Sequence, residues 1–382
     1  MAMDLAGIID LFTENFNQSG ELGASVCIRR HGEEILHLAD GYCDREKTIG
    51  WTKETPVLIW SATKGLSSAC LIHAAAEHDI SLDRKVIDLW PEYEQNGKGE
   101  TTLLHILSHQ AGQPALRNGT VSILDHDAVA SELARQEPFW KPGEKHGYHP
   151  RTYGYLVDEL VRRITQGTPL GTYFRLAFGD PLDLHLWIGI PEAMADHVAP
   201  IFAPRKPRAP ESDQSFYQAL ADPRSLTREA FSTPVGLISP SQMNDPKVRR
   251  HSLPSLGGIG TAGALARFYQ TLYSDEIFSA ETVCRIATTQ CSGQDEVLRI
   301  ETAFGTGFMK DPVKGEKKIR QIFGPERSGF GQPGSGGSLG FCDPTNEISF
   351  AYVMNQMEQG VFPNSKSLRL VSHFYERLGE IQ

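Results

Sequence analysis

Ser61 and Lys64 form the tetrapeptide S-x-x-K at the point where an apolar run, residues 56–60, meets a helical pattern. Three residues make almost one helical turn, so the two side chains are expected on one face and within reach of each other. A serine hydroxyl becomes a useful nucleophile when a neighbouring base takes its proton, and a lysine can be that base when burial and the positive end of a helix dipole lower its pKa. The spacing therefore predicts a nucleophile, Ser61, activated by Lys64, at a helix N-terminus whose backbone N–H groups can bind an oxyanion.

A second serine, Ser338, lies in the stretch GGSLG, which has the G-x-S-x-G pattern of the nucleophile elbow in α/β-hydrolases. An elbow requires a strand, a sharp turn and a helix, with an acid and a histidine further along the chain. Asp343 and His373 stand in that order, but the acid is only five residues beyond the serine, and a β-like run comes next instead of a helix. We therefore predict that Ser338 is a strand residue behind the wall that binds the oxyanion.

Two further stretches stand in the order found in serine hydrolases of the β-lactamase and penicillin-binding-protein type. KPGEKHGYHPRTYG (141–154) resembles the second motif of that superfamily, and GFGQPGSGGSLGF (329–341) resembles the third, normally Lys-Thr-Gly on a strand edge. With WSATKG, LLHILSHQAG and YHPRTYGYLVDELVRR, they make nearly the whole chain similar to the family VIII carboxylesterases, which have the fold of class C β-lactamases. The resemblance implies an α/β (α+β) fold with an antiparallel sheet flanked by helices and a mainly helical domain.

The resemblance also implies roles for individual residues. Tyr148 becomes the catalytic tyrosine and shares one proton with Lys64, so that either group can take the proton of Ser61. Tyr148 can then protonate the leaving alkoxide as a general acid. The backbone N–H groups of Ser61 and Ser335 form the oxyanion hole.

Gln332 and Pro333 stand where the superfamily has the lysine and threonine of its third motif, and Pro150 stands where an asparagine usually follows the tyrosine. The resemblance implies that these changes remove polar contacts to a peptide-like substrate that carries a carboxylate. We predict a carboxylesterase that hydrolyses short- to medium-chain esters through an acyl-serine, with Gln332, Gly334 and Gly336 in contact with the substrate. The alternatives are an acyltransferase or transesterase, a weak β-lactamase or penicillin-binding-type former of an acyl-enzyme, and a binding protein that is acylated without turnover.

The elements that must position these residues follow from hydrophobic periodicity and turn signals. The pattern predicts a helix over 1–18, a hairpin over 24–42, helices over 61–78, 101–112, 126–136, 151–167 and 257–273, C-terminal strands and a final helix over 365–379. We expect an α/β domain of residues 1–80 and 256–382 and a mainly helical domain of residues 81–255. The proline-rich segment 199–210, which contains Phe202, is expected to act as a loop or lid that shapes the pocket together with Phe216.

Other patterns resemble binding motifs but lack residues that those motifs require. His105 and His109 lie four residues apart, as metal ligands on one helix face do, but the glutamate of H-E-x-x-H is missing, and we expect no metal. The glycine-rich stretch 257–263 lacks the βαβ unit of a phosphate-binding loop and is expected to line the pocket. We expect His146 and His149 to lie around the site or at the surface. Arg205, Lys206 and Arg208 form a short basic patch among prolines that we expect to be solvated.

The composition is that of an ordinary globular protein, with 40% hydrophobic and 22% charged residues among 382. The net charge of −10 disfavours nucleic acid and anionic membranes as partners. The family resemblance implies a small-molecule ester as the partner. Six scattered cysteines without a CxxC pair indicate thiols in a reducing compartment. The first 18 residues do not resemble a signal peptide, and no apolar stretch approaches 18 residues, so we predict a cytoplasmic protein without a cofactor and leave its oligomeric state open.

Overall fold

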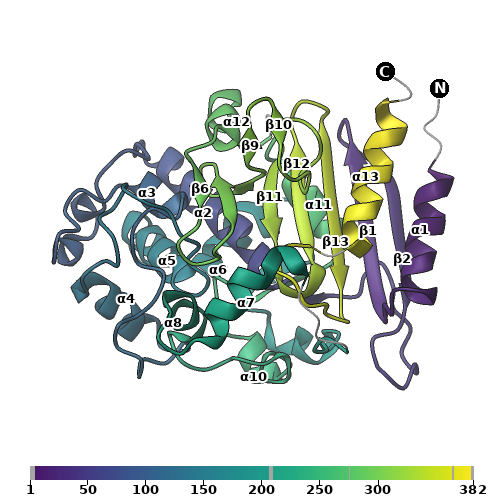
Figure 1. The fold of residues 1–382 in the computed structure, drawn as a ribbon, viewed down its shortest axis with the longest axis horizontal. Helices are drawn as coiled ribbons and strands as arrows, with labels where there is room; N and C mark the ends of the chain where they lie inside the picture. The colour runs from purple at the N-terminus through teal and green to yellow at the C-terminus, as the bar shows by residue number, and fades with distance from the viewer. Residues whose placement is uncertain (1–4, 206–209, 275, 364, 380–382) are drawn as a thin grey trace.

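The computed structural model describes residues 5–205, 210–274, 276–363 and 365–379. Its main sheet is antiparallel, in the order β2-β1-β13-β12-β11-β8-β7-β6 (Figure 1). The strands are β1 (Gly23–Arg30), β2 (Glu33–Gly41), β6 (Cys291–Gln294), β7 (Glu301–Phe304), β8 (Met309–Lys310), β11 (Phe330–Pro333), β12 (Leu339–Asp343) and β13 (Ile348–Met354). Because β1 pairs with β13, the N- and C-terminal parts of the chain form one sheet, as the predicted fold class requires.

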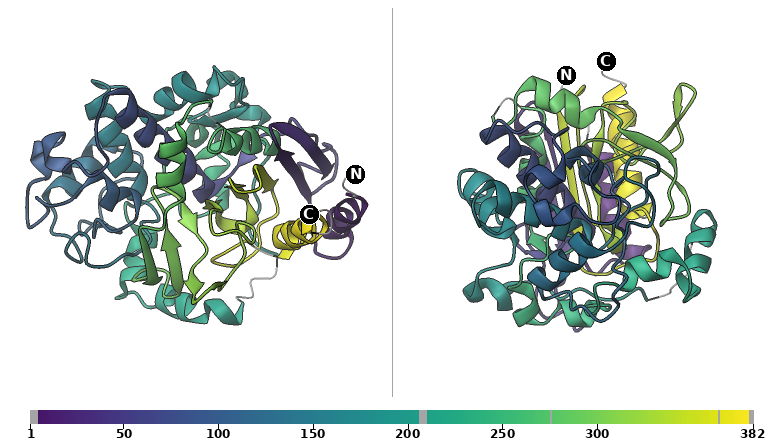
Figure 2. Two further views of the ribbon diagram at one scale, coloured as in Figure 1. Left: turned by 90° about the horizontal axis from the view of Figure 1, so that it is seen from above. Right: turned by 90° about the vertical axis from the view of Figure 1, so that its left-hand side faces the viewer.

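Helices cover both faces of this sheet. On one face α1 (Ala6–Asn17) and α13 (Ser365–Gly379) lie side by side, and on the other face α11 (Ala262–Gln270) packs on β1, β12 and β13 (Figure 2). The packing is so close that a Cβ atom at Gly340 on β12 would lie only 2.4 Å from the ring of Tyr269 on α11. The long buried runs of β1 and β13 follow from having a helix layer on each side.

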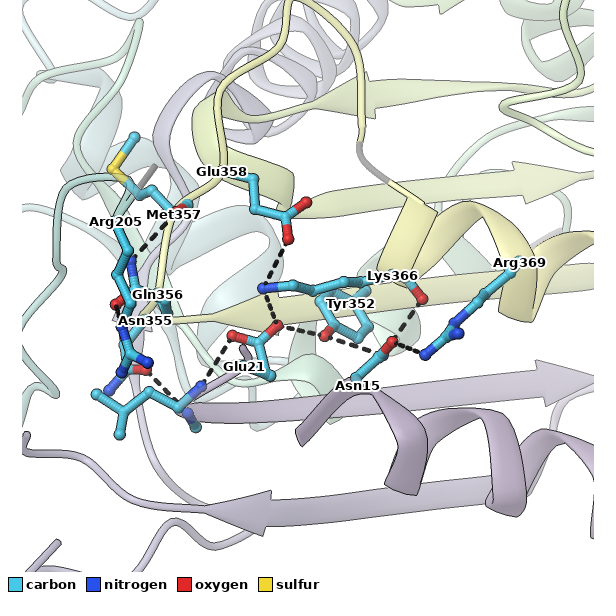
Figure 3. Close-up of polar contacts among 12 residues, drawn as sticks. Asn15, Glu21, Arg205, Tyr352, Asn355, Gln356, Met357, Glu358, Lys366 and Arg369 are labelled. Atoms are coloured by element: carbon cyan, nitrogen blue, oxygen red, sulfur yellow. Dashed lines mark hydrogen bonds and ion pairs between the residues drawn. The ribbon is translucent and has the colours of Figure 1, made fainter. Parts of the chain in front are cut away.

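A buried polar cluster joins α1, the sheet and α13 (Figure 3). The Lys366 Nζ atom lies 3.2 Å from a Glu21 carboxylate oxygen and 3.1 Å from Glu358, and the side chains of Lys366 and Glu21 are fully buried. The hydroxyl of Tyr352 on β13 donates to Glu21 at 2.7 Å, and Asn15 on α1 donates to the Tyr352 oxygen at 3.4 Å. Charges buried in this way are tolerated because each one has a partner.

The rest of the chain is mainly helical and lies beside the sheet. Its central helix, α2 (Thr63–Glu77), is buried over almost its whole length against α5 (Tyr153–Ile164), α6 (Leu170–Phe174) and β11. The other helices are α3 (Leu103–Leu107), α4 (His126–Arg135), α7 (Gln214–Ala221), α8 (Leu226–Ser232), α9 (Pro240–Met243), α10 (Pro246–Arg249) and α12 (Ala280–Ala287). Short strands complete the structure: β3 (Val57–Leu58), β4 (Leu186–Ile188), β5 (Gly258–Gly260), β9 (Val313–Lys314) and β10 (Lys317–Lys318).

The predicted hairpin and the helices at 61–78, 126–136, 151–167 and 365–379 are confirmed, within a few residues at their ends. The prediction of a helix from residue 257 is wrong at its start. Residues 258–260 form β5 between β3 and β4, and α11 begins only after Thr261, which caps it. Close packing requires glycines in this strand, because a Cβ atom would lie 2.7 Å from the His185 carbonyl oxygen at Gly260 and 2.6 Å from the Thr63 hydroxyl oxygen at Gly258.

The proline-rich segment contains no helix or longer strand among its described residues. Ala199 donates to the Pro56 carbonyl, and Phe202 donates to the Asn355 carbonyl, so this segment is tied to the sheet side of the molecule. Arg205 is exposed and donates to the Gln356 side chain, while Lys206 and Arg208 lie outside the described residues. The division into domains after residues 80 and 255 stays a prediction.

Candidate active site

Ser61 lies in the short 3-10 turn η1 (Trp60–Ala62) that leads directly into α2. The preceding residue, Trp60, has a φ of +49°, in the left-handed region that a bulky side chain rarely adopts. Backbone strain of this kind persists where the surrounding structure imposes it, and it is frequent at active sites. Ser61 itself is half-buried and lines a cleft, so its hydroxyl can reach a ligand.

Lys64 lies one helical turn further and is completely buried. Its Nζ atom is 3.2 Å from the Ser61 Oγ atom and 2.8 Å from each of two backbone carbonyl oxygens, those of Pro150 and Ser255. Burial lowers the pKa of Lys64 well below its usual value, and the positive charge of Arg151 lowers it further.

The three partners of the Lys64 amine fill its three hydrogen-bonding positions in either the charged or the neutral form. A neutral amine has two N–H groups and one lone pair, and the two carbonyls can only accept hydrogen bonds. In the neutral form, which the lowered pKa of Lys64 favours, the lone pair is left for the proton of the Ser61 hydroxyl. The proline at position 150 replaces a side-chain contact expected of the superfamily, but its backbone carbonyl still contacts the lysine.

Tyr148 lies in the irregular segment before α5 and is buried beside Ser61 and Lys64. The Lys64 Nζ atom lies 4.9 Å from the centre of its ring. Burial raises the pKa of the Tyr148 phenol, while a hydrogen bond with Ser61 acts in the opposite direction. The structure therefore brings together the three side chains that the sequence singled out, with the Ser61 hydroxyl between the amine and the phenol.

Strand β11 and the turn η7 (Ser335–Gly337) form the opposite wall of the cleft. The side chain of Gln332 is buried, and its Nε2 atom lies 3.5 Å from the Tyr148 hydroxyl oxygen. Gly334 touches the segment before Ser61, because a Cβ atom there would lie 2.2 Å from the Ile59 carbonyl oxygen. Ser335 is the first residue of its turn, so its N–H group has no partner within that turn.

Ser338 does not reach the cleft. Its hydroxyl is buried and donates to the Ile59 carbonyl at 2.9 Å, and β12 comes directly after it instead of a helix. The prediction that this serine lies behind the wall is confirmed, except that it ends the turn before the strand instead of belonging to the strand.

The cleft has a volume of about 270 Å³. The described residues that line it carry no charge: Ser61, Tyr148, Phe216, Tyr217, Leu220, Phe231, Leu298, Met309, Gln332, Pro333, Gly334, Ser335, Gly360 and Val361. Phe216 contributes as predicted, but Phe202 does not, since its ring packs under the Arg45 guanidinium. Gly336 also lies outside this lining. It has a φ of +87° and packs against Met357, so its predicted contact with substrate is not supported by this geometry.

The histidines near the motifs are structural in this arrangement. His105 completes the cap of α3 by accepting from the Thr102 backbone N–H. The His109 Nδ1 atom accepts from the backbone N–H of His149, and its ring lies 5.0 Å from the ring of Tyr148. The expectation that His146 and His149 are near the site is met, but both are buried and neither is at the surface.

Candidate metal ligands come together elsewhere. Among the described residues, Cys27, Glu34 and His37 on the β1–β2 hairpin are grouped closely enough to share an ion, and none of them lines the cleft. The six cysteines are all free thiols, and Cys284 is exposed. The glycine-rich stretch predicted to line the pocket is absent from the lining, because its glycines pack in β5 and against His37.

Sequence reasoning missed the groups that hold Tyr148 from behind, namely Asp295, Phe304 and His109. The Tyr148 backbone N–H lies 3.0 Å from each carboxylate oxygen of Asp295, and its ring stacks on Phe304 with an interplanar angle of 10°. Asp295 does carry a local signal, because an aspartate often forms an Asx turn, in which its side chain accepts from backbone N–H groups a few residues further along the chain. That signal predicts a turn but cannot reveal a contact 147 residues away.

The antiparallel sheet with two helix layers, and the buried S-x-x-K helix beside it, define a protein of the β-lactamase-like fold. The chain belongs to the beta-lactamase family, whose family model matches residues 8–372. The esterase/beta-lactamase LipL of Mycobacterium tuberculosis is 30% identical over 88% of this chain and 77% of that protein.

Solved structures agree with this assignment over almost the whole chain. A penicillin-binding-protein homologue from Caulobacter crescentus is 32% identical, with a TM-score of 0.85 over 98% of this chain and 97% of that one. A family VIII carboxylesterase is 28% identical, with a TM-score of 0.85 over 98% and 97% of the two chains. EstA from Arthrobacter nitroguajacolicus Rue61a is 27% identical, with a TM-score of 0.84 over 98% and 96%. The resemblance predicted from the motifs is confirmed.

None of the described helices has the length and apolar character that crossing a bilayer requires.

Proposed function

We propose that this chain is a serine carboxylesterase that hydrolyses uncharged, short- to medium-chain esters through an acyl-serine. The observation that carries the proposal is the set of partners of the buried Lys64 amine, two backbone carbonyls and the Ser61 hydroxyl. Relatives that are named as an esterase/beta-lactamase and as a family VIII carboxylesterase support the same reaction class.

In the proposed acylation step, the Ser61 Oγ atom attacks the ester carbonyl carbon while its proton passes to the Lys64 amine. The backbone N–H groups of Ser61 and Ser335 stabilise the oxyanion that forms. The carbon–oxygen bond to the alcohol then breaks, and the Tyr148 phenol gives its proton to the departing alkoxide. The Lys64 ammonium then gives its proton to the tyrosinate, which restores both groups. In deacylation water attacks the acyl carbonyl carbon and gives a proton to Lys64, the Ser61 oxygen leaves with the proton of Tyr148, and the acid is released.

The directions of the two pKa shifts support this division of labour. A lowered pKa favours the neutral form of Lys64, which can accept a proton. A raised pKa keeps the Tyr148 phenol protonated, and thus suited to be the acid instead of the base. Gln332 contributes to this, because an uncharged amide beside the phenol oxygen does not stabilise a phenolate as a lysine would.

The cleft supports the substrate class. Its described lining combines aromatic and aliphatic side chains from α7, α8 and the segments around residues 298, 309 and 361, and none of these described residues carries a charge that could hold a carboxylate. An apolar acyl or alcohol group of limited size fits a volume of about 270 Å³. We propose that a small-molecule ester is the partner, and that the protein acts in a reducing, cytoplasmic setting in which its six cysteines stay free.

The test is steady-state hydrolysis of p-nitrophenyl esters from acetate to octanoate. We expect Ser61→Ala to lower kcat by about 10⁴ or more, and Ser338→Ala to retain most of the activity in a folded protein. Lys64→Met should be almost inactive. Lys98→Met is its matched control, because Lys98 is another buried lysine whose amine donates to two backbone carbonyls, outside the cleft. Loss of turnover in Ser338→Ala with activity retained in Ser61→Ala would overturn the assignment.

A chromogenic cephalosporin and an added alcohol separate the alternatives. We expect at most slow opening of the cephalosporin, because no charged group in the described lining can bind its carboxylate. Ester product formed from the added alcohol would identify acyl transfer. A single stoichiometric burst without further turnover would identify a protein that is only acylated.

A further inference from the structure

We propose that Asp295 is a positioning residue for the reaction, whose buried carboxylate holds the backbone of Tyr148 and so fixes the phenol beside Ser61. This inference rests on the proposed function and deepens it. Asp295 lies in the turn between β6 and β7, at the edge of the main sheet. Asp295 is not in the cleft lining itself, but it accepts from the backbone of two residues that are, Tyr148 and Leu298, so it acts on the cleft through them.

The carboxylate of Asp295 is fully buried, and both of its oxygens accept hydrogen bonds. Both of its oxygens lie 3.0 Å from the Tyr148 backbone nitrogen, and one accepts at 2.8 Å from each of the Val297 and Leu298 N–H groups. The Thr302 hydroxyl donates to the other oxygen at 3.0 Å. The carboxylate therefore closes the β6–β7 turn and, at the same point, ties this turn to the segment that carries the phenol.

The same hairpin also holds the ring of Tyr148. Phe304 at the end of β7 stacks on it with ring centres 6.4 Å apart, and His109 packs at 5.0 Å. Tyr148 belongs to an irregular segment, so no helix or strand hydrogen bonds of its own define its position. Backbone and ring are thus both located by one hairpin, and Asp295 is the group that links them.

The carboxylate of Asp295 affects the pKa of Tyr148 as well as its position, which an uncharged acceptor would not do. The negative charge of Asp295 contributes to the raised pKa of Tyr148, after burial. The titratable groups that interact with Asp295 are His146, whose Nε2 atom lies 3.0 Å from the Thr302 hydroxyl oxygen, and Cys291 on β6; Glu296 acts on His146. Tyr148 in turn faces Lys64 and His109. A role in closing the turn alone would affect stability, whereas a role at Tyr148 also affects the pH dependence of turnover.

The experiment compares Asp295→Asn with the wild type in steady-state hydrolysis of p-nitrophenyl butyrate across pH. We expect kcat to fall roughly 10- to 100-fold, as for a misplaced catalytic group, with KM changed less than about threefold. The alkaline limb of the kcat profile should move to lower pH, because the Tyr148 phenol loses a neighbouring negative charge.

Asp311→Asn is the matched control. Asp311 is also a buried carboxylate that accepts from two backbone N–H groups, those of Ile322 and Phe323; it pairs in addition with Lys318 at 3.2 Å, and it is not in the described cleft lining. We expect its loss to lower the melting temperature and to leave kcat and the pH profile unchanged. Thr302→Val tests the same support with a smaller change, and we expect a roughly three- to tenfold lower kcat.

The inference is wrong if folded Asp295→Asn keeps the wild-type kcat and alkaline limb, or if Asp311→Asn lowers kcat equally. Should Asp295→Asn fail to fold, a wild-type kcat in Thr302→Val overturns it. Ser61→Ala separates this outcome from failure of the proposed function. If Ser61→Ala still hydrolyses esters, the function itself is wrong, whereas an inactive Ser61→Ala with an unaffected Asp295→Asn rejects only the role of Asp295.

Discussion

Gly334 allows the two walls of the cleft to lie in close contact, because it has no side chain. Replacing it by alanine is a direct test of the proposed oxyanion hole. Its φ of −113° is open to any residue, so only space requires glycine at this position. A Cβ atom would lie 2.2 Å from both the Ile59 carbonyl oxygen and the Ser338 Oγ atom. To restore an ordinary contact, β11 and the segment before Ser61 must separate by about 1 Å.

That displacement moves the Ser335 N–H group away from the Ser61 oxyanion position. Loss of one oxyanion donor typically costs about 10²–10³ in kcat, or about 2.7–4 kcal/mol of transition-state stabilisation. A misplacement of about 1 Å has an effect of similar size. We therefore expect Gly334→Ala to lower kcat for p-nitrophenyl butyrate by about 10²–10³, with a smaller change in KM.

The assay measures kcat and KM together with the melting temperature, so that loss of fold is separated from loss of chemistry. Gly119→Ala is the control, because a Cβ atom at this exposed glycine meets nothing within 4 Å and its φ is not in the left-handed region. Its kinetics should match the wild type. A folded Gly334→Ala protein with wild-type kcat would show that Ser335 does not stabilise the oxyanion, and the reasoning would be refuted.

Because burial lowers the pKa of Lys64, the unfolded chain binds more protons than the folded one, so wild-type stability relative to Lys64→Met should rise from pH 7 to pH 9 in chemical denaturation. A stability difference between the two proteins that does not change with pH would contradict a neutral Lys64 amine. Because only the neutral amine can accept the Ser61 proton, kcat/KM should fall as acid protonates this lysine. Gln332→Lys places a cation near the Tyr148 oxygen, 3.5 Å from the present amide, and should shift the alkaline limb to lower pH and speed acylation by a cephalosporin. Unchanged cephalosporin kinetics would show that this position does not select against carboxylates. Glu21→Gln removes a partner of the buried Lys366 and should lower the free energy of unfolding by about 3–5 kcal/mol in urea denaturation, with kcat intact. A loss below about 1 kcal/mol would show that the cluster is not stabilised by this pair.

Much of the fold was predictable because its signals are local. The final helix over 365–379 and the hairpin around His31 and Gly32 follow from periodicity and a turn. The stretch from 257 was predicted wrongly because a run of glycines before a helix is compatible with either a helix start or a strand. Only contact with β3 and β4 makes residues 258–260 a strand.

The pair Ser61 and Lys64 could be identified from the amino-acid order alone, since their spacing places them one turn apart wherever the helix lies. Ser338 could be excluded in the same way, because a β-like run and not a helical pattern follows it in the sequence; the structure has β12 at this place. The family motifs pointed to Tyr148 and Ser335, but not to the distances between them.

The surroundings of these groups depend on tertiary contacts. The carbonyls of Pro150 and Ser255 orient the Lys64 amine, and Asp295 holds Tyr148, although these partners are 86, 191 and 147 residues apart in the chain. Backbone carbonyls have no sequence signature, and a contact across such separations is fixed by how β11, α2 and the β6–β7 hairpin pack. The pKa of a lysine depends on that packing, because burial in the assembled protein, not the identity of the residue, removes the water that would keep it charged.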